Sequence, residues 1–349
     1  SDAQLEQVVY AGQAHADLLP DGSRRGYFIG DGTGVGKGRE ISGIILDNWN
    51  QGRTKAVWVS EKAPLLKDAQ RDWGGLGQDG ELIFPLSKTA ADGAVKGERG
   101  ILFTTYDTLK GGMRAQQQAA TGSITKGSRV RLAGGPEGQL VPGAAEKVGT
   151  VMSTRSMAGG WLSVRVRWDG ESKSEIVSVP SLVEISRPAS VKSRIDQIVD
   201  WVGADFDGVI AFDEAHNMAN AVTVSGNRGA TQPSQKALAG IELQQRLPNA
   251  RVVYVSATGA TEVSNLAYAD RLGLWGYRTA FANVTDFLSK VGQGGIAAME
   301  LIARDMKALG LYIARNLSYD GVEYERVDHT LTPDQREIYD EIAGMWQVV

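Results

Sequence analysis

Residues 27–38 read YFIGDGTGVGKG, a short apolar run followed by a glycine-rich segment that ends in Gly-Lys-Gly. A strand that passes through glycines into a helix brings backbone N–H groups and a helix N-terminus to one place, which is how many proteins hold phosphate. The residues expected to line the phosphates of ATP are Gly32, Thr33, Gly34, Val35, Gly36, Lys37, Gly38 and Arg39. A glycine-rich turn without a ligand fits the same letters, and the acidic motif described below disfavours it.

Two positions depart from the usual phosphate loop. Asp31 stands where the first glycine is expected, and Gly38 stands where a Ser or Thr hydroxyl normally holds Mg²⁺. Lys37 is retained and would reach the β and γ phosphates.

Apolar runs and helical patterns alternate on both sides of this loop. The predicted strands cover residues 27–29, 56–59, 101–104, 208–212 and 251–255, and the predicted helices cover residues 41–49, 65–73, 194–201 and 235–245. Buried strands that alternate with amphipathic helices indicate βαβ units and a parallel sheet. We therefore predict an α/β domain that is interrupted once and then resumes.

The interruption has a different pattern. Its short alternating runs cover residues 130–132, 149–152, 162–168, 176–179 and 182–185. Such strands, joined by glycine-rich connections without a helix, indicate a small antiparallel β-barrel, and the pattern resembles barrels of the Tudor and KOW kind. Between residues 122 and 186, eight Lys or Arg stand against six Asp or Glu, so a nucleic-acid-binding module and a passive spacer or protein-binding module both remain open.

The sequence Asp213-Glu214-Ala215-His216 follows the apolar run 208–212. The acids therefore emerge at the carboxyl end of a buried strand, where α/β sheets bind their ligands. Asp213 is expected to hold Mg²⁺ and Glu214 to orient and deprotonate the attacking water, with His216 completing a catalytic set that includes Lys37. Surface acids at a strand end are the alternative for a bare Asp-Glu pair.

A third motif, Ser256-Ala257-Thr258, follows the run 251–255. Its hydroxyls would couple the nucleotide site to a bound strand, with His216 as the candidate link. An ordinary polar turn is the alternative for this motif taken alone.

The order of these three motifs resembles that of superfamily-two helicases, and longer stretches resemble the strawberry notch family of helicase-like ATPases. Among them are YFIGDGTGVGKGREISGIILDNW at residues 27–49 and LPNARVVYVSATGATEVSNLAYADRLGLWG at residues 247–276. The resemblance implies a RecA-like P-loop lobe, and glycine at position 38 is typical of this family. A large phage or plasmid protein is the favoured source.

The resemblance also implies binding residues. Gln4 would read the adenine edge, with Gln7 and Gln13 as rival candidates and a solvated helix face as the alternative. The residues that would contact a nucleic-acid backbone are Ser60, Lys62, Thr104 and Thr105. Lys67 and Arg71 could add charge there, although a solvated helix face explains them better.

These features divide the chain into four parts. Residues 1–120 and 189–330 are the two parts of the RecA-like lobe, residues 121–188 are the inserted barrel, and residues 331–349 begin a linker helix toward an absent second lobe. The helix is predicted from Thr332-Pro333-Asp334-Gln335, a capping box with proline at the first helical position. The first residue is Ser rather than Met, which suggests a piece of a longer polypeptide.

Composition restricts the chemistry. The chain of 349 residues has no cysteine, three histidines and a formal net charge of −4. Disulfides, zinc ribbons and thiol nucleophiles are excluded, so a metal must bind to carboxylates, which points to Mg²⁺. No apolar run reaches the roughly 20 residues of a membrane span, so no membrane partner is expected. The expected location is the cytoplasm of a bacterial or phage-infected cell, or the nucleus if the source is a eukaryote.

The leading functional hypothesis is the N-terminal motor lobe of a nucleic-acid-dependent ATPase, a helicase or translocase. Its cofactors would be ATP and Mg²⁺, and its partners would be nucleic acid, DNA in preference to RNA, and the second RecA-like lobe of the same parent polypeptide. The isolated lobe is expected to hydrolyse ATP poorly, because the second lobe usually supplies an arginine. The alternatives are a non-hydrolysing nucleotide-binding switch or interaction module and, less favoured, a small-molecule kinase.

Overall fold

The fold is described from a computed structural model. It describes residues 1–91, 93–112, 124, 127–132, 148–156, 162–178, 182–186, 192–222, 224–226, 229–257, 266–315, 325 and 330–347. The chain divides into two compact units, residues 1–316 and residues 317–349.

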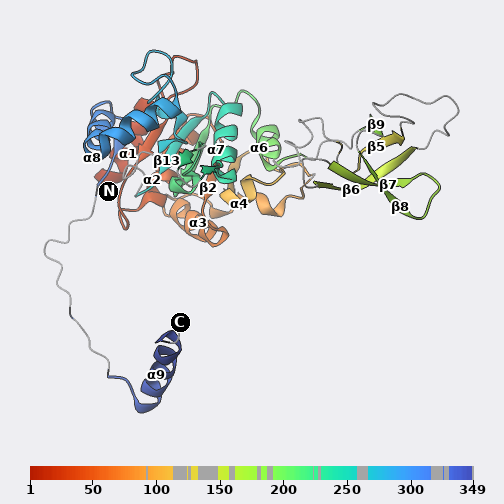
Figure 1. Cartoon of the computed structure of the whole chain (residues 1–349). Helices are drawn as coiled ribbons and strands as arrows, with labels where there is room; N and C mark the ends of the chain where they lie inside the picture. The colour runs from red at the N-terminus through yellow and green to blue at the C-terminus, as the bar shows by residue number, and fades with distance from the viewer. Residues whose placement is uncertain are drawn as a thin grey trace. The chain divides into compact units, whose positions relative to one another are not determined.

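A seven-stranded parallel sheet lies at the centre of the first unit (Figure 1). Its order is β14-β1-β13-β10-β2-β4-β3. The strands are β1 (Tyr27–Ile29), β2 (Lys55–Ser60), β3 (Ile83–Pro85), β4 (Gly100–Thr105), β10 (Val209–Asp213), β13 (Arg251–Val255) and β14 (Tyr312–Ile313). The predicted parallel α/β fold is confirmed, with β3 and β14 as strands that the sequence patterns did not predict.

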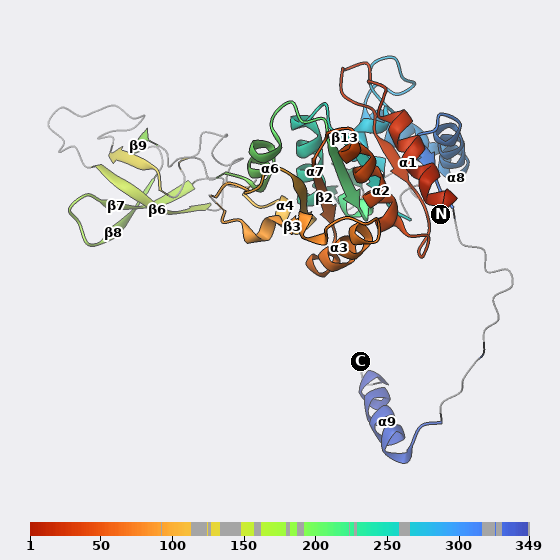
Figure 2. The same cartoon turned by 180° about the vertical axis from the view of Figure 1, so that it is seen from behind.

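Helices cover both faces of this sheet (Figures 1 and 2). They are α1 (Asp2–Ala14), α2 (Lys37–Asn50), α3 (Leu66–Gly74), α4 (Tyr106–Leu109), α6 (Arg194–Val202), α7 (Gln235–Arg246) and α8 (Val284–Ala308). The connection through α2 runs from β1 to β2, whereas the connection through α7 runs across the sheet in the opposite direction, from β10 to β13. Right-handed crossovers in opposite directions place their helices on opposite faces. Accordingly α1, α2 and α3 pack together in one layer, and α4, α6 and α7 pack together in the other.

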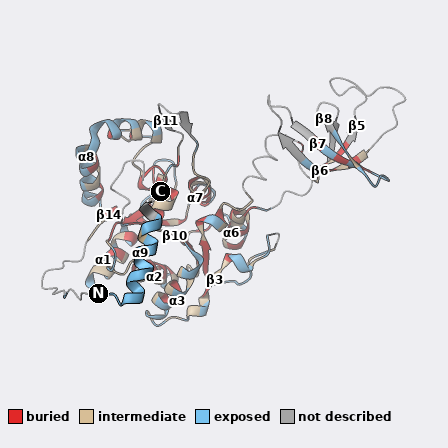
Figure 3. Cartoon of the chain, turned by 60° about the horizontal axis from the view of Figure 1, so that its bottom comes forward, coloured by how far each residue is buried: buried red, intermediate tan, exposed pale blue. Residues whose placement is uncertain are grey.

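The strands of this sheet read as continuous apolar runs because both faces are covered. In β10, the four residues from Val209 to Phe212 are all buried, and so are the four residues from Val252 to Val255 in β13. Figure 3 shows the buried residues concentrated in the central sheet and the helix faces packed on it. This burial leaves the carboxyl ends of the strands as the place where polar side chains meet.

The predicted insertion contains a separate antiparallel sheet with the order β8-β7-β6-β5-β9. Its strands are β5 (Arg129–Leu132), β6 (Val148–Ser156), β7 (Leu162–Trp168), β8 (Ser174–Ser178) and β9 (Leu182–Ser186). It has its own small core, formed by Ile124, Val130, Val151, Val164, Val166 and Trp168. All five predicted strands are present, and the described pairings leave β8 and β9 at the edges.

Two short strands, β11 (Val224–Gly226) and β12 (Gly229–Thr231), form an antiparallel pair after the acidic motif. In the second unit, α9 (Pro333–Gln347) begins where the capping box predicted it. The backbone N of Gln335 donates to Thr332 Oγ1 at 3.3 Å, and the backbone N of Thr332 donates to Gln335 Oε1 at 3.1 Å. No helix in the described ranges has the length and apolar character that crossing a membrane requires.

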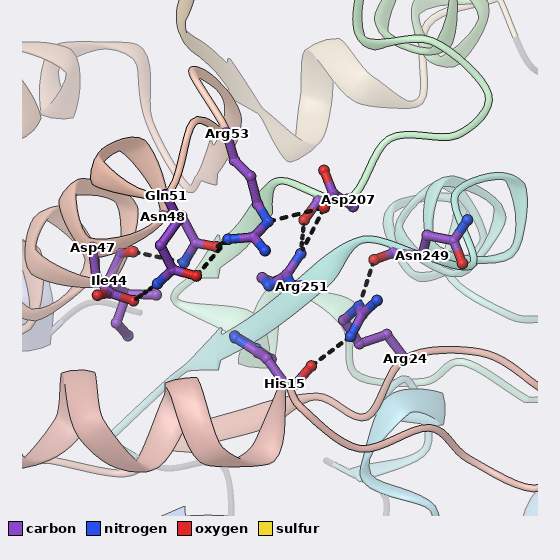
Figure 4. Close-up of polar contacts among 10 residues, drawn as sticks. All are labelled: His15, Arg24, Ile44, Asp47, Asn48, Gln51, Arg53, Asp207, Asn249 and Arg251. Atoms are coloured by element: carbon purple, nitrogen blue, oxygen red, sulfur yellow. Dashed lines mark hydrogen bonds and ion pairs between the residues drawn. The ribbon is translucent and has the colours of Figure 1, made fainter.

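An arginine-rich cluster lies at the amino ends of the strands (Figure 4). Arg53 Nε donates to Asp207 Oδ2 at 2.9 Å, and Arg251 pairs with the same carboxylate at 3.3 Å. Burial acts to raise the pKa of Asp207, but the two arginines outweigh it and the pKa is lowered. Beside them, Arg24 Nη1 donates to the backbone O of His15 at 2.6 Å. The cluster links the end of α1 to the amino ends of β2, β10 and β13, at the edge of the sheet opposite the predicted motifs.

Candidate nucleotide site

The glycine-rich segment forms a loop between the end of β1 and the start of α2. Gly34 and Gly36 have φ values of 89° and 101°, a left-handed conformation that residues with a side chain rarely adopt. Helix α2 begins at Lys37, and among the described residues no side chain caps its first turn. The backbone N of Arg39 and of Glu40 donates to the O of Gly36, at 2.9 and 3.2 Å, so the N–H groups of Lys37 and Gly38 are the ones in this turn that an anion can use. The loop has the backbone form of a phosphate-binding loop.

Asp31, at the position of the usual first glycine, is fully buried. Its carboxylate accepts hydrogen bonds from Gln7 Nε2 at 2.9 Å, from the backbone N of Arg315 at 2.9 Å and from Nη2 of Arg315 at 3.1 Å. The backbone N of Gly32 also donates to the O of Arg315 at 2.7 Å. These three donors, one of them on the Arg315 guanidinium, compensate the buried charge. Asp31 thus fixes the loop to α1 and to the segment that follows β14.

The three glutamines considered for adenine binding lie in different surroundings on α1. Gln4 Nε2 donates to the backbone O of Val35 at 3.1 Å, and a Cβ at Gly36 would overlap with that amide. Gln7 is buried and accepts a hydrogen bond from Tyr27 Oη at 2.5 Å. Gln13 is exposed. Of the three, Gln4 and Gln7 support the phosphate loop directly.

Asp213 is the last residue of β10 and lies beside the end of β2. Ser60 Oγ donates to Asp213 Oδ2 at 2.9 Å, and Tyr106 Oη donates to the backbone O of Asp213 at 2.9 Å. Burial raises the pKa of Asp213, the Ser60 hydrogen bond lowers it, and the charge of Glu214 raises it again, so that the pKa is raised. A bound divalent cation would favour the ionised carboxylate instead.

The residues after Asp213 connect the acidic motif to the third motif. Glu214 has φ 48° and ψ 51°, a left-handed conformation that is uncommon outside glycine and that frequently marks functional sites. His216 Nδ1 lies 3.3 Å from Glu214 Oε2 and 3.2 Å from Ser256 Oγ. The backbone N of Ser256 donates to the O of Ile29, the last residue of β1, at 3.0 Å.

Ser256 therefore joins the strand that leads into the phosphate loop to the histidine of the acidic motif. The predicted contact between these two motifs is present. Ala257 is exposed, and Thr258 lies outside the described residues.

Glu40, in the first turn of α2, is fully buried, and neither of its carboxyl oxygens has a hydrogen-bond partner among the described residues. Burial, followed by the neighbouring Asp31, raises its pKa to about 8, against the opposing charges of Arg315 and Lys37. Glu40 therefore favours its neutral, protonated form well above the pH at which an exposed glutamate ionises.

The acidic side chains around the loop fit a magnesium ion that a nucleotide helps to hold. No three acidic or histidine side chains within the described ranges converge on one point. Mg²⁺ is commonly held by one or two carboxylates together with substrate phosphates and water, so Asp213 suffices as a protein ligand. Position 38 contributes no side-chain oxygen.

The four residues predicted to contact nucleic acid differ in exposure. Ser60 and Thr104 are buried, with exposed fractions of 0% and 3%, and Ser60 is engaged by Asp213. Lys62 has an exposed side chain, and Thr105 is half-buried and caps α4 by accepting from the backbone N of Thr108 at 3.1 Å. A surface contact therefore depends on Lys62 and Thr105.

Sequence patterns missed three residues of the site: Tyr106, Glu40 and Arg315. Tyr106 lies two residues after the end of a predicted strand, so its position near a strand end was a usable signal. Arg315 has no local signal, because it lies 284 positions from Asp31. The acid at position 31 was itself a clue, since a buried carboxylate needs donors.

Comparisons with known proteins agree with this arrangement. A sequence model of the family described as P-loop containing NTP hydrolase pore-1 matches residues 1–131 and 176–341. The protein strawberry notch of Drosophila melanogaster is 37% identical over 99% of this chain and 17% of its own length. Human strawberry notch homolog 1 is 35% identical over 100% of this chain and 20% of its own length, and FORGETTER 1 of Arabidopsis thaliana is 34% identical over 98% and 21%.

The chain thus spans about a fifth of the length of these relatives. Among solved structures, the Sulfolobus solfataricus SWI2/SNF2 ATPase core in complex with dsDNA is 12% identical, with a TM-score of 0.42, over 84% of this chain and 40% of that chain. The resemblance to the strawberry notch family that was predicted from the sequence is confirmed.

Proposed function

Since the chain belongs to the P-loop containing NTP hydrolase pore-1 family, we propose that it is the first motor lobe of a nucleic-acid-dependent ATPase, a helicase or translocase. One observation carries this proposal. Strand β13 lies between β1 and β10, and Ser256 at its end contacts both the end of β1 and His216. A nucleotide-binding switch without hydrolysis has no need of a polar connection between its phosphate loop and its acids.

The proposed roles follow from the chemistry of phosphoryl transfer, which requires positioning and charge neutralisation. The Lys37 ammonium and the backbone N–H groups of Lys37 and Gly38 would bind the β and γ phosphates. Glu214 would orient the attacking water and accept its proton. His216, which contacts both Glu214 and Ser256, would couple the two residues. Asp213 would hold Mg²⁺, which neutralises phosphate charge when it is bound.

The nucleic-acid contact is proposed at the carboxyl ends of β2 and β4. Lys62 lies just after β2, and Thr105 is the last residue of the neighbouring β4; solvent reaches both side chains. Contacts to phosphates through an ammonium and a hydroxyl group carry no base sequence, which suits a motor that moves along any strand. The identity of the strand, DNA or RNA, is an outcome of the test below.

A second lobe is also part of the proposal. Motors of this kind complete the site with an arginine from another lobe, and such residues accelerate hydrolysis by roughly 10³-fold or more. We therefore expect residues 1–349 alone to bind ATP but to hydrolyse it slowly.

The test compares ATP hydrolysis by a polypeptide that carries both lobes, with single-stranded DNA, duplex DNA or RNA at one fixed salt concentration, because nucleic-acid binding depends strongly on salt. Glu214→Gln should reduce stimulated hydrolysis by at least about 100-fold, the contribution of a general base, while ATP binding is retained. Glu300→Gln, on the exposed surface of α8, is the matched control and should change neither.

Absence of stimulated hydrolysis by the unchanged two-lobe polypeptide, with every nucleic acid, would reject the motor hypothesis. If ATP still bound, the non-hydrolysing switch, which the departures at Asp31 and Gly38 also allow, would take its place.

A further inference from the structure

The space beside Gly38 is filled by a carboxylate from another helix. A Cβ at Gly38 would overlap with Asp72 Oδ2 and would lie 3.2 Å from Asp72 Cγ and 3.8 Å from Asp72 Cβ. Real Cβ atoms do not approach other atoms so closely, so a Ser or Thr at this position would displace Asp72. An oxygen of Asp72 therefore lies where the side chain of a usual phosphate loop would begin.

This carboxylate has few partners. Asp72 lies on α3, and its Oδ1 is 3.6 Å from Nη2 of Arg39, a distance too long for a hydrogen bond. Within the described ranges no hydrogen bond to either oxygen of Asp72 accompanies this ion pair. The Asp72 side chain is 20% exposed. Oδ2 thus keeps free acceptor capacity beside the first turn of α2.

We propose that Asp72 replaces the hydroxyl missing at position 38 and holds the Mg²⁺ of the bound nucleotide, directly or through a water molecule. This inference rests on the proposed ATP-binding function. A carboxylate is a preferred Mg²⁺ ligand, so the exchange of ligand type is chemically sound. The same site would then have two acids, Asp72 and Asp213, where a usual phosphate loop has one acid and one hydroxyl.

The exchange has a consequence that a merely structural aspartate would not have. A hydroxyl is neutral, whereas the Asp72 carboxylate repels the phosphates of ATP whenever no cation lies between them. Removal of Asp72 should therefore weaken ATP binding in Mg²⁺ and strengthen it in EDTA. Loss of packing or of the Arg39 ion pair would instead weaken binding in both conditions.

The experiment measures the affinity of residues 1–349 for a fluorescent ATP analogue in Mg²⁺ and in EDTA, and Mn²⁺ binding by electron paramagnetic resonance in the presence of ATP. Asp72→Ala and Asp72→Asn should each lower Mn²⁺ affinity roughly tenfold, the usual effect of removing a supporting metal partner. Asp68→Ala is the matched control, because Asp68 is a half-exposed acid on the same helix that pairs with Arg71 at 2.8 Å.

A double variant tests the replacement itself. In Gly38→Ser with Asp72→Ala, the hydroxyl occupies the vacated space, and we expect Mn²⁺ affinity to recover at least partly. The inference is overturned if the Asp72 variants, folded by circular dichroism, bind Mn²⁺ and nucleotide as the unchanged chain does, or lose affinity equally in Mg²⁺ and EDTA. If the unchanged chain binds no nucleotide in either condition, the proposed function fails, and this inference fails with it.

Discussion

The buried Glu40 beside the phosphate loop makes protein stability depend on pH in a defined direction. Its pKa rises from 4.5 to about 8 in the folded chain. Below pH 4.5 both the folded and the unfolded chain keep the proton. Between pH 4.5 and 8 only the folded chain keeps it, so increasing pH favours unfolding, and above pH 8 the folded chain loses it too. The pKa difference corresponds to a loss of up to about 5 kcal/mol of unfolding free energy, at about 1.4 kcal/mol per pH unit.

The substitution Glu40→Gln removes the ionisation and keeps the shape. The amide is neutral, as the protonated carboxyl is, and has nearly the same size. We expect the variant and the unchanged chain to have similar unfolding free energies near pH 4.5, and the variant to be more stable by a few kcal/mol at pH 8.5. Urea unfolding followed by tryptophan fluorescence at five pH values measures this. Glu300→Gln on exposed α8 controls for net charge. A stability difference that stays constant from pH 4.5 to 8.5 would refute the reasoning.

Three further predictions concern the other contacts of the site. Arg315→Ala removes the charge partner of the buried Asp31 and should lower the free energy of unfolding, measured in urea, by about 3 kcal/mol. The double variant Asp31→Gly with Arg315→Ala should recover most of that loss. Equal destabilisation in the single and the double variant would contradict the pairing. Glu214→Gly relieves the strain of the left-handed backbone at position 214, so the free energy of unfolding should rise by about 0.5 kcal/mol while hydrolysis is lost. If this variant is no more stable than Glu214→Ala, the backbone at position 214 is not strained. Ser256→Ala removes the hydroxyl beside His216, so ATP binding should be unchanged while the ratio of stimulated to unstimulated hydrolysis falls roughly tenfold; an unchanged ratio would show that this contact does not couple the sites.

The sheet was predictable where burial leaves a long pattern. Strands β2, β4, β10 and β13 have five or six residues each and are covered on both faces, so their sequences are continuous apolar runs. Strands β3 and β14 have three and two residues. Segments this short have no measurable period, and they are strands only because a neighbouring strand offers them hydrogen bonds. The sequence of α8 contains Gly292, Gly294 and Gly295, which hides a helix from propensity arguments, and Gly295 does break its geometry.

The site was predictable where chemistry is carried by consecutive residues. Asp213 is the last residue of β10, Glu214 and Ser256 follow β10 and β13 directly, and Lys37 follows β1 through the glycine-rich loop. The parallel sheet therefore brings them to one edge. Position at a strand end did not predict which of these side chains are exposed to solvent. Ser60 lies at the end of β2, near the predicted strand end, but its hydroxyl donates to Asp213 on the adjacent strand instead of facing solvent. A residue at a strand end can face the surface or the neighbouring strand, and sequence position does not distinguish the two.

The two departures from the usual phosphate loop have a common physical explanation. Each changes the electrostatics of the loop through a partner distant in sequence: Asp31 binds Gln7, 24 positions away, and Arg315, 284 positions away, while Gly38 makes room for Asp72. Comparison with the usual loop pattern finds an acid where glycine is expected and a glycine where a hydroxyl is expected. Both positions then count as lost binding residues. A buried acid persists only with donors around it, and a missing side chain leaves a volume that close packing fills. Departures of this kind therefore indicate where a search for compensating residues should begin, and in this loop the two searches lead to Arg315 and to Asp72.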